Sequence, residues 1–187
     1  TPQTARIDAH SWAQEGVSRL CYCRTVFHAK AASILAGRTP TQICAELYGE
    51  AGSSADIEII SLMLNALQQA GLQNLHLDLG HVGIFKAFAE KAQLSNEAEE
   101  ELFALLKVKC ATDLDAWAEQ YLLDAKLNHA FKAFVRLQGG IEVLDQVDQQ
   151  LSTVIPEVSA IIEHLKQVCQ TIATRYQVPM YFDFTDL

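Results

Sequence analysis

The sequence predicts an α+β fold with an antiparallel or mixed sheet, flanking helices and an all-helical insertion. Two strand-like segments, residues 18–28 and 43–48, follow one another across a loop. Two more strand-like segments come later, and residues 94–151 are helical in pattern throughout. The order is therefore strand, strand, helix, strand, helices, strand. This order indicates hairpins with interspersed helices and not a regular βαβ series.

The N-terminal part predicts a long hairpin with an extended loop. A short helix is expected around Trp12. Residues 18–28 alternate as a strand, and the segment 30–40, rich in Ala, Gly, Thr and Pro, separates it from a second strand over Ile43–Tyr48. Gly49 ends that second strand, and the small residues after it mark a break.

A helix and a third strand follow the hairpin. Ser53 or Ser54 can cap a helix that runs to Ala70, with acidic residues in its first turn. Residues 74–79 alternate as a strand, and residues 82–92 predict another helix. The buried stripe expected on the first helix is Ile57, Ile60, Met63, Leu64 and Leu67.

The rest of the chain is mainly helical. Ser95 and Thr112 are placed to cap two helices, and Gly139-Gly140 breaks the helical series. Pro156 fits the first turn of a long helix that reaches residue 176. Residues 178–184 carry three aromatic side chains and predict the closing strand.

Composition excludes several classes of protein. The chain has 187 residues, 50% of them apolar, which suits one domain with an ordinary core. Its net charge of −9 disfavours nucleic acid as a partner. The apolar runs are far shorter than a membrane span of about 20 residues, and no signal segment opens the chain. Five scattered cysteines predict free thiols in a reducing cytoplasm.

Five polar side chains lie on or between the two hairpin strands: Arg24, His28, Arg38, Gln42 and Glu46. Side chains four residues apart share one face of a strand, about 13 Å apart at roughly 3.3 Å per residue. Such a face can form a pocket for a small zwitterion, in which a carboxylate accepts from an ammonium or imidazole N–H and Arg binds a carboxylate. The alternative, favoured by the pattern alone, is a solvated sheet face with a surface Arg–Glu pair.

Other motifs carry less information. Cys21 and Cys23 lack the spacing of a zinc site, so we expect core packing and no metal. His76 is expected to point out of the core, and His81 to cap or contact the following helix. No dinucleotide, phosphate-loop, serine-hydrolase or zinc-protease motif occurs, so no cofactor is expected.

The hairpin resembles motif 2 of class II histidyl-tRNA synthetases. It is more similar still to their non-synthetase paralogues, the regulatory subunits of ATP phosphoribosyltransferase. The resemblance is strong over residues 18–90, fair over 156–187 and weak between them. The segments that carry it are Arg19–Tyr22, Val26–His28, Gln42–Gly49, Ala55–Glu58, Leu77–Phe85 and Tyr181–Phe184.

The chain departs from the synthetases where they bind ATP. Their motif 2 reads Phe-Arg-x-Glu, whereas this chain has His28 at the Arg position and Lys30 at the Glu position. The resemblance therefore implies a lost nucleotide clamp and no aminoacyl adenylate formation. Gln42 and Glu46 match the positions that bind histidine in the synthetases. With Arg38, they are the candidate histidine-binding residues.

The resemblance implies a class II synthetase-like core over residues 1–92, a helical insertion over 93–152 and the closing helix and strand of the core over 153–187. It implies a non-catalytic, allosteric regulatory subunit in histidine biosynthesis. Its partner would be the catalytic subunit of ATP phosphoribosyltransferase, with histidine as effector. The alternatives are an active histidyl-tRNA synthetase and an interaction module with a vestigial pocket.

The resemblance also implies that the chain is the middle of a longer protein. The dimerisation motif of the synthetases would precede the chain, and their Arg-Gly-Tyr histidine motif would follow it. The histidine pocket is then expected to be incomplete within these residues.

Overall fold

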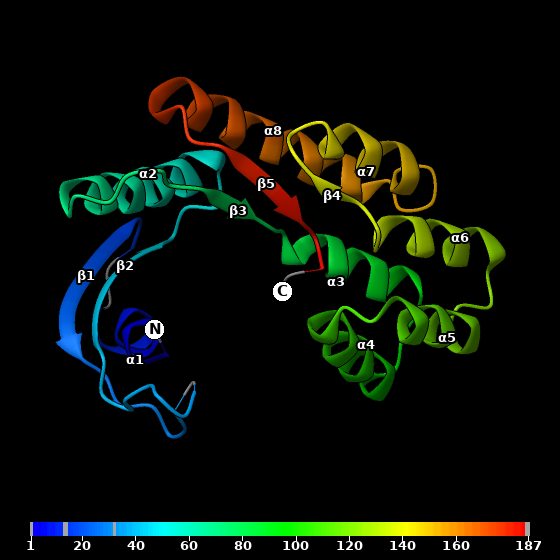
Figure 1. The fold of residues 1–187 in the computed structure, drawn as a ribbon, viewed down its shortest axis with the longest axis horizontal. Helices are drawn as coiled ribbons and strands as arrows, with labels where there is room; N and C mark the ends of the chain where they lie inside the picture. Colours follow the sequence, from blue (N-terminus) through cyan, green and yellow to red (C-terminus); the bar gives the residue numbers. More distant parts are fainter. Residues whose placement is uncertain (1, 13–14, 32, 186–187) are drawn as a thin grey trace. The chain divides into compact units, whose positions relative to one another are not determined.

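The structure is a computed structural model, and it describes residues 2–12, 15–31 and 33–185. The chain divides into two compact units, Thr1–Ala66 and Leu67–Leu187, which are drawn in Figure 1. No helix among the described residues is long and apolar enough to cross a membrane.

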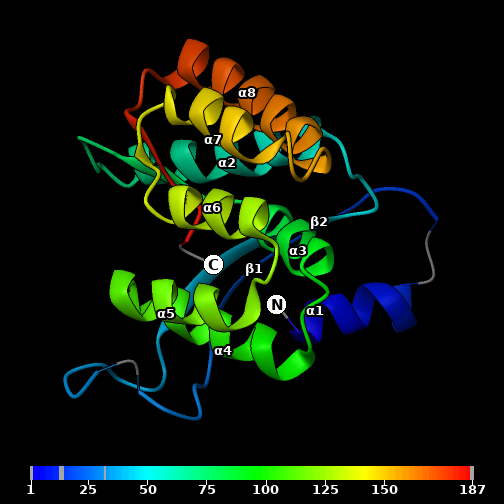
Figure 2. The ribbon, with the colours of Figure 1, turned by 90° about the vertical axis from the view of Figure 1, so that its right-hand side faces the viewer.

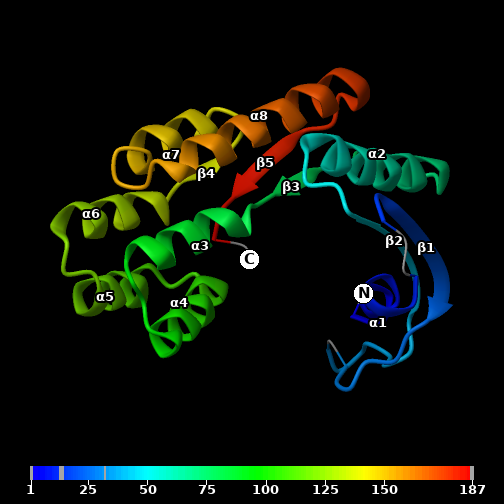
Figure 3. The ribbon, with the colours of Figure 1, turned by 180° about the vertical axis from the view of Figure 1, so that it is seen from behind.

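The first unit is a curved two-stranded hairpin with a helical segment beside it and a long helix after it (Figures 1 and 3). Both strands contain many residues that favour extended backbone, and the loop between them is rich in small residues. The elements are α1 (Pro2–Ile7), a π-helical turn η1 (Asp8–Trp12), β1 (Ser18–Thr25), β2 (Thr41–Tyr48) and most of α2 (Ser53–Gln69).

The predicted hairpin is confirmed, with one difference at the end where the loop joins the two strands. β1 and β2 pair antiparallel from Ser18 opposite Tyr48 to Thr25 opposite Thr41. Beyond Thr25 the regular ladder stops, because the chain enters a loop. Two backbone bonds nevertheless continue the pairing toward the loop. The Val26 amide donates to the Pro40 carbonyl at 3.0 Å, and the His28 amide donates to the Arg38 carbonyl at 2.8 Å.

The two faces of the hairpin contact different elements. Arg19 forms a bidentate pair with Glu58 of α2, at 2.5 Å from Nε to Oε1 and 2.9 Å from Nη2 to Oε2. Tyr22 and Gln42 belong to the opposite face, where they line a hollow together with residues of α1. The strict alternation of side chains along each strand therefore separates a face toward α2 from a face toward α1.

The second unit contains a three-stranded mixed sheet and six helices among the described residues. The strand order is β3-β5-β4, with β3 parallel and β4 antiparallel to β5. The consecutive helices α4 to α7 pack neighbour against neighbour, and Figure 2 shows α6, α7 and α8 in succession. The elements are β3 (Leu77–Leu79), α3 (Val82–Lys91), α4 (Asn96–Val108), α5 (Ala111–Tyr121), α6 (Ala125–Phe134), β4 (Gln138–Gly139), α7 (Val143–Leu151), α8 (Glu157–Tyr176) and β5 (Met180–Asp183).

One hydrophobic core joins the helices of the second unit to β5. Phe88 of α3 stacks on Phe131 of α6 with ring centroids 4.9 Å apart, and Trp117 lies 5.6 Å from the same ring. Phe182 and Phe184 are fully buried at the end of the sheet. The helices of the predicted insertion thus share their core with α3, α8 and β5. The boundaries 1–92, 93–152 and 153–187 stay a prediction.

Several details differ from the sequence prediction for local reasons. The third strand begins at Leu77 and not at residue 74, where Asn74 has φ +57°, outside the extended region. Thr112 is not a cap: the helix begins at Ala111 after Cys110. The expected break at Gly139 contributes a short strand that pairs with Phe182.

Burial differs from the prediction at three side chains. Met63 is 43% exposed, so the stripe predicted on α2 is wrong at this position. Leu64 of the same stripe is buried, as expected. Cys21 and Cys23 are exposed free thiols, which is not the core packing we expected of them. Both cysteines lie on the same hairpin face as Ile43, which is also exposed.

Gly49 directly follows β2, at a position where a side chain does not fit. Its φ is +83°, and a Cβ there would lie 2.3 Å from the Gly16 carbonyl oxygen. Gly71 has the same φ, with open space around it. We expect Gly71→Ala to destabilise the protein by about 1 kcal/mol, the cost of the left-handed backbone alone.

Gly49→Ala should cost about 2 kcal/mol more, because the clash adds to the same backbone cost. Chemical denaturation followed by circular dichroism compares the two variants. Equal losses of stability would contradict the close approach of Gly49 to Gly16.

Candidate functional site

Gln42 and Glu46 lie on one face of the hairpin, as their spacing predicts. Residues that stand opposite each other in an antiparallel pair share a face. Gln42 stands opposite Arg24, and Glu46 stands opposite Leu20. The candidate face therefore carries an amide, a guanidinium and a carboxylate together.

The Glu46 carboxylate is held by its neighbours on the same strand. The Tyr48 hydroxyl donates to Oε2 of Glu46, and the Cys44 thiol donates to Oε1 at 3.5 Å. All three side chains are partly buried. Because they are two residues apart along β2, the pleat alone places them side by side.

The hydrogen bond to Glu46 raises the pKa of Tyr48 to about 12, with smaller contributions from desolvation and from the nearby charges of Glu46 and Asp8. A tyrosine whose folded pKa lies above its ordinary value of 10 stabilises the fold fully below about pH 10. That stabilisation is lost as the pH rises toward 12. At neutral pH, Tyr48 is therefore a neutral donor to the carboxylate.

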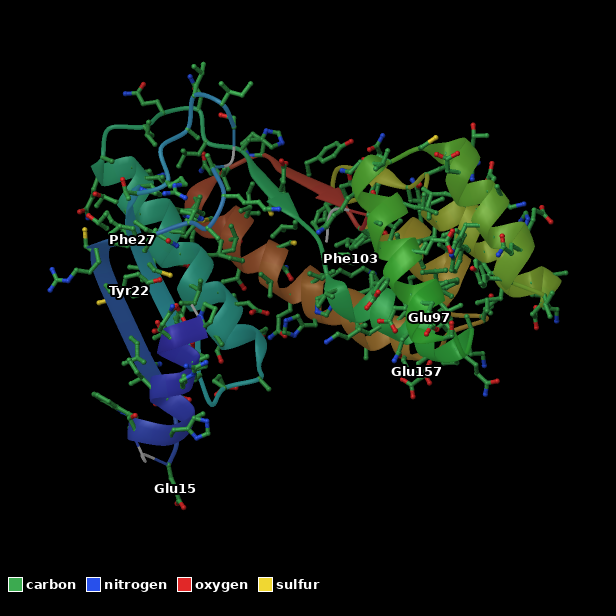
Figure 4. The ribbon with its side chains drawn as sticks, turned by 90° about the horizontal axis from the view of Figure 1, so that it is seen from below. Glu15, Tyr22, Phe27, Glu97, Phe103 and Glu157 are labelled. Carbon is green, nitrogen blue, oxygen red and sulfur yellow. The ribbon has the colours of Figure 1, made fainter. Side chains whose placement is uncertain are left out.

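A hollow of about 610 Å³ opens beside this face in the first unit. Gln42 and His28 both line it. Gln42 matches a histidine-binding position of the synthetases that the chain resembles, whereas His28 stands in place of their ATP-binding Arg. Tyr22 and Phe27, labelled in Figure 4, line it as well. Residues 2–4 of α1 also line it. Glu46 is not among the lining residues of this hollow.

The remaining predicted residues lie toward the loop. Arg38 is joined to His28 through its backbone carbonyl, and its side chain is exposed. Lys30 is exposed in the bend that follows His28 and does not line the hollow. Arg24 is exposed on the candidate face. The structure thus brings Gln42 and His28 together, but it does not gather Arg38, Lys30 and Glu46 at the same point.

The hairpin segment that carries the candidate face is basic in sequence. Residues 16–45 contain four Lys or Arg and no Asp or Glu. The rest of the chain has ten basic against 23 acidic residues, a charge of −13. A carboxylate such as Glu46 at the end of a basic hairpin can take a cationic group, while the basic side chains favour an anionic one.

Two histidines outside the hairpin, His76 and His81, lie next to the third strand. His81 caps α3, as the sequence predicts, because its Nδ1 accepts from the Gly83 amide at 3.0 Å. His76 is exposed and lies 3.7 Å from Asp78, measured from Nε2 to Oδ1. Within the described ranges, no three His, Cys, Asp or Glu residues gather in a way that could hold a metal ion.

Tyr48 and Tyr22 were missed as site residues by sequence reasoning. Tyr48 had a detectable signal, because it is two residues beyond Glu46 and so must share its face. Tyr22 had none, since its place in the hollow depends on the register of the hairpin and on the position of α1.

The hairpin, the mixed sheet and the covering helices define a class II aminoacyl-tRNA synthetase-like fold. A regulatory subunit of ATP phosphoribosyltransferase/histidyl-tRNA synthetase from Bacillus halodurans is similar over 100% of this chain and 48% of its own, with a TM-score of 0.81 and 23% identity. A chain of the ATP phosphoribosyl transferase complex from Thermotoga maritima gives a TM-score of 0.68 at 13% identity, over 98% of this chain and 64% of that one. These likenesses establish the fold.

Sequence similarity shows the family to which the chain belongs. The profile described as histidyl-tRNA synthetase matches residues 1–187, and the chain belongs to the histidyl-tRNA synthetase family. Curated relatives named ATP phosphoribosyltransferase regulatory subunit are 46% identical in Cellvibrio japonicus and 43% in Pseudomonas fluorescens, each over 100% of this chain. The chain spans about half the length of these relatives, 47% in both.

The hydrogen bond between Tyr48 and Glu46 predicts a measurable change in tyrosine ionisation. In Glu46→Gln the charge is gone, so the pKa of Tyr48 should fall from about 12 toward its ordinary value of 10. The ultraviolet absorbance of phenolate at about pH 11 should then increase by one tyrosine relative to the wild type. Adding Tyr48→Phe to Glu46→Gln should remove that increment. Identical titrations of wild type and Glu46→Gln would show that the hydrogen bond is not formed.

Proposed function

We propose that this chain is part of a non-catalytic regulatory subunit of ATP phosphoribosyltransferase, which acts in the cytoplasm at the first step of histidine biosynthesis. The observation that carries the proposal is an identity of 40–46% over the whole chain to relatives that bear this name. The partner is the catalytic subunit, in a hetero-oligomer. The fold likeness to a chain of the Thermotoga maritima complex is in keeping with that partner.

The candidate face supports a role in binding histidine. Histidine presents an ammonium and an imidazole as donors and a carboxylate as acceptor. Glu46 is a partly buried carboxylate, fixed by Tyr48 and Cys44, and it can accept from either donor group. Gln42 orients the ligand from the same face. Arg38 stays the sequence-predicted candidate for the ligand carboxylate, and in this structure it lies toward the loop, away from Glu46.

The hairpin lacks the residues that hold ATP in the synthetases it resembles. His28 and Lys30 replace the Arg and the Glu of that motif, and Lys30 is exposed in the loop. A flexible ammonium does not reproduce a carboxylate, and an imidazole does not reproduce the bidentate guanidinium. The site therefore binds an amino acid without activating it.

Binding without chemistry regulates through linkage. Histidine binds one assembly state of the complex more tightly than the other and shifts the population toward the inhibited state. A tenfold preference of histidine for that state corresponds to about 1.4 kcal/mol of coupling.

Feedback inhibition tests the proposed site in the full-length protein assembled with its catalytic subunit. Glu46→Gln should raise the histidine concentration for half-maximal inhibition about tenfold or more, because a charged hydrogen bond to the ligand is lost. Glu101→Gln is the matched control: Glu101 accepts a hydrogen bond from Tyr121 at 2.9 Å in the second unit. This control should leave the inhibition curve unchanged.

Two outcomes of that assay would contradict the proposal. An unchanged curve in Glu46→Gln would remove Glu46 from the histidine site. A wild-type complex that needs this subunit for activity but does not respond to histidine would favour an interaction module with a vestigial pocket.

The second candidate is an active histidyl-tRNA synthetase, which the family membership favours. Because His28 and Lys30 replace the ATP-binding pair, we expect no histidine-dependent exchange of pyrophosphate into ATP by the full-length protein. A histidyl-tRNA synthetase assayed in parallel is the positive control. Exchange above the level without protein would establish the synthetase reading instead.

A further inference from the structure

Tyr48 stands next to the proposed histidine site without belonging to the predicted set of ligand-binding residues. Its hydroxyl donates to Oε2 of Glu46, while the thiol of Cys44 donates to Oε1. One donor therefore comes from two residues before Glu46 and the other from two residues after it. A carboxylate oxygen can accept more than one hydrogen bond, so neither of these two contacts by itself prevents a ligand N–H from donating to Glu46.

The end of β2 is fixed immediately after Tyr48. Gly49 turns the chain with φ +83° and approaches Gly16 so closely that a Cβ would lie 2.3 Å from its carbonyl oxygen. Tyr48 itself stands opposite Ser18, which is buried. The tyrosine ring therefore projects from a constrained backbone, and its hydroxyl reaches Glu46 from a defined direction.

We propose that Tyr48 is a positioning residue for histidine binding, which acts through Glu46 and does not itself touch the ligand. This inference rests on the proposed function. A glutamate side chain has several rotatable bonds, and holding it in one rotamer before binding removes an entropic cost from the binding step. The hydroxyl of Tyr48 favours one rotamer of Glu46. The pleat of β2 places the two side chains on the same face, two residues apart.

The charges around the pair define what the tyrosine contributes. Asp8 of η1 is close enough to act on Tyr48, and it has the same sign of charge as Glu46. Because Tyr48 is neutral, it orients the carboxylate without cancelling the charge that attracts the ligand. A Lys or Arg at this position would instead pair with the carboxylate and compete with a cationic ligand.

The test is a double-mutant cycle on histidine affinity, measured by calorimetric titration of the full-length protein. Tyr48→Phe keeps the ring and removes the hydroxyl, and Glu46→Gln keeps the shape and removes the charge. We expect Tyr48→Phe to weaken histidine binding about tenfold in the wild-type background. In the Glu46→Gln background it should weaken binding less than about twofold, because the group that it positions is already disabled.

A second variant separates positioning from packing. Replacing Tyr48 by 4-aminophenylalanine returns an N–H donor to the ring at the same place, and it should recover most of the lost affinity. Tyr121→Phe is the matched control, because Tyr121 donates to Glu101 in the second unit in the same way. It should leave histidine affinity unchanged, and thermal unfolding of every variant checks that each one folds.

The possible outcomes separate this inference from the proposed function. If Glu46→Gln binds histidine as tightly as the wild type, the proposed site fails and the inference fails with it. If Glu46→Gln weakens binding but Tyr48→Phe does not, the site stands and the positioning role is overturned. Equal losses from Tyr48→Phe in both backgrounds, with no recovery by 4-aminophenylalanine, show a packing role only and also overturn it.

Discussion

The register of β1 against β2 is the constraint on which the candidate site depends. Side chains alternate along each strand, so a slip of β2 by one residue against β1 would move Glu46 to the face that contacts α2, on which Arg19 lies. The bidentate pair between Arg19 and Glu58 opposes such a slip on one side. The tight approach of Gly49 to Gly16 opposes it at the end opposite the loop. Backbone geometry, more than a large core, therefore defines this face.

The second unit is stabilised in a different way. Its helices bury regular stripes of apolar side chains, and aromatic rings from α3, α5 and α6 meet around Phe131. The sheet adds few hydrogen bonds, but β5 places the buried Phe182, and the turn after it the buried Phe184, against that core. Burial of this kind tolerates many apolar sequences, provided that volume and pattern are kept. A family match over residues 1–187 and a fold likeness over the whole chain are compatible with such a core.

How much of this could be predicted from the sequence depended on the range of the interaction. The hairpin, the cap made by His81 and the shared face of Gln42 and Glu46 follow from local rules, and all three were predicted. The exposure of Met63 and Cys21 depends on what packs over them, which no local pattern contains. The hollow beside Gln42 needs α1 to return to the hairpin, and its sequence carries no signal for that contact. Tyr48 is intermediate between the local and the long-range features. Its spacing from Glu46 can be seen in the sequence, but its hydrogen bond to Glu46 is seen only in the structure.

A site that binds an amino acid and cannot activate it has a use only if binding itself changes something. In an enzyme, interactions that strengthen in the transition state accelerate the reaction, and equally strong binding of the ground state does not. A regulator has no transition state to stabilise, so its ligand contacts favour one assembly state over another. On the proposed function, replacing the nucleotide pair by His28 and Lys30 removes the reaction and leaves Gln42 and Glu46 to sense histidine. A preorganised carboxylate suits that task, because the entropy of ordering its side chain is lost on folding and not on binding. The full free energy of the ligand contact can then shift the equilibrium between the assembly states.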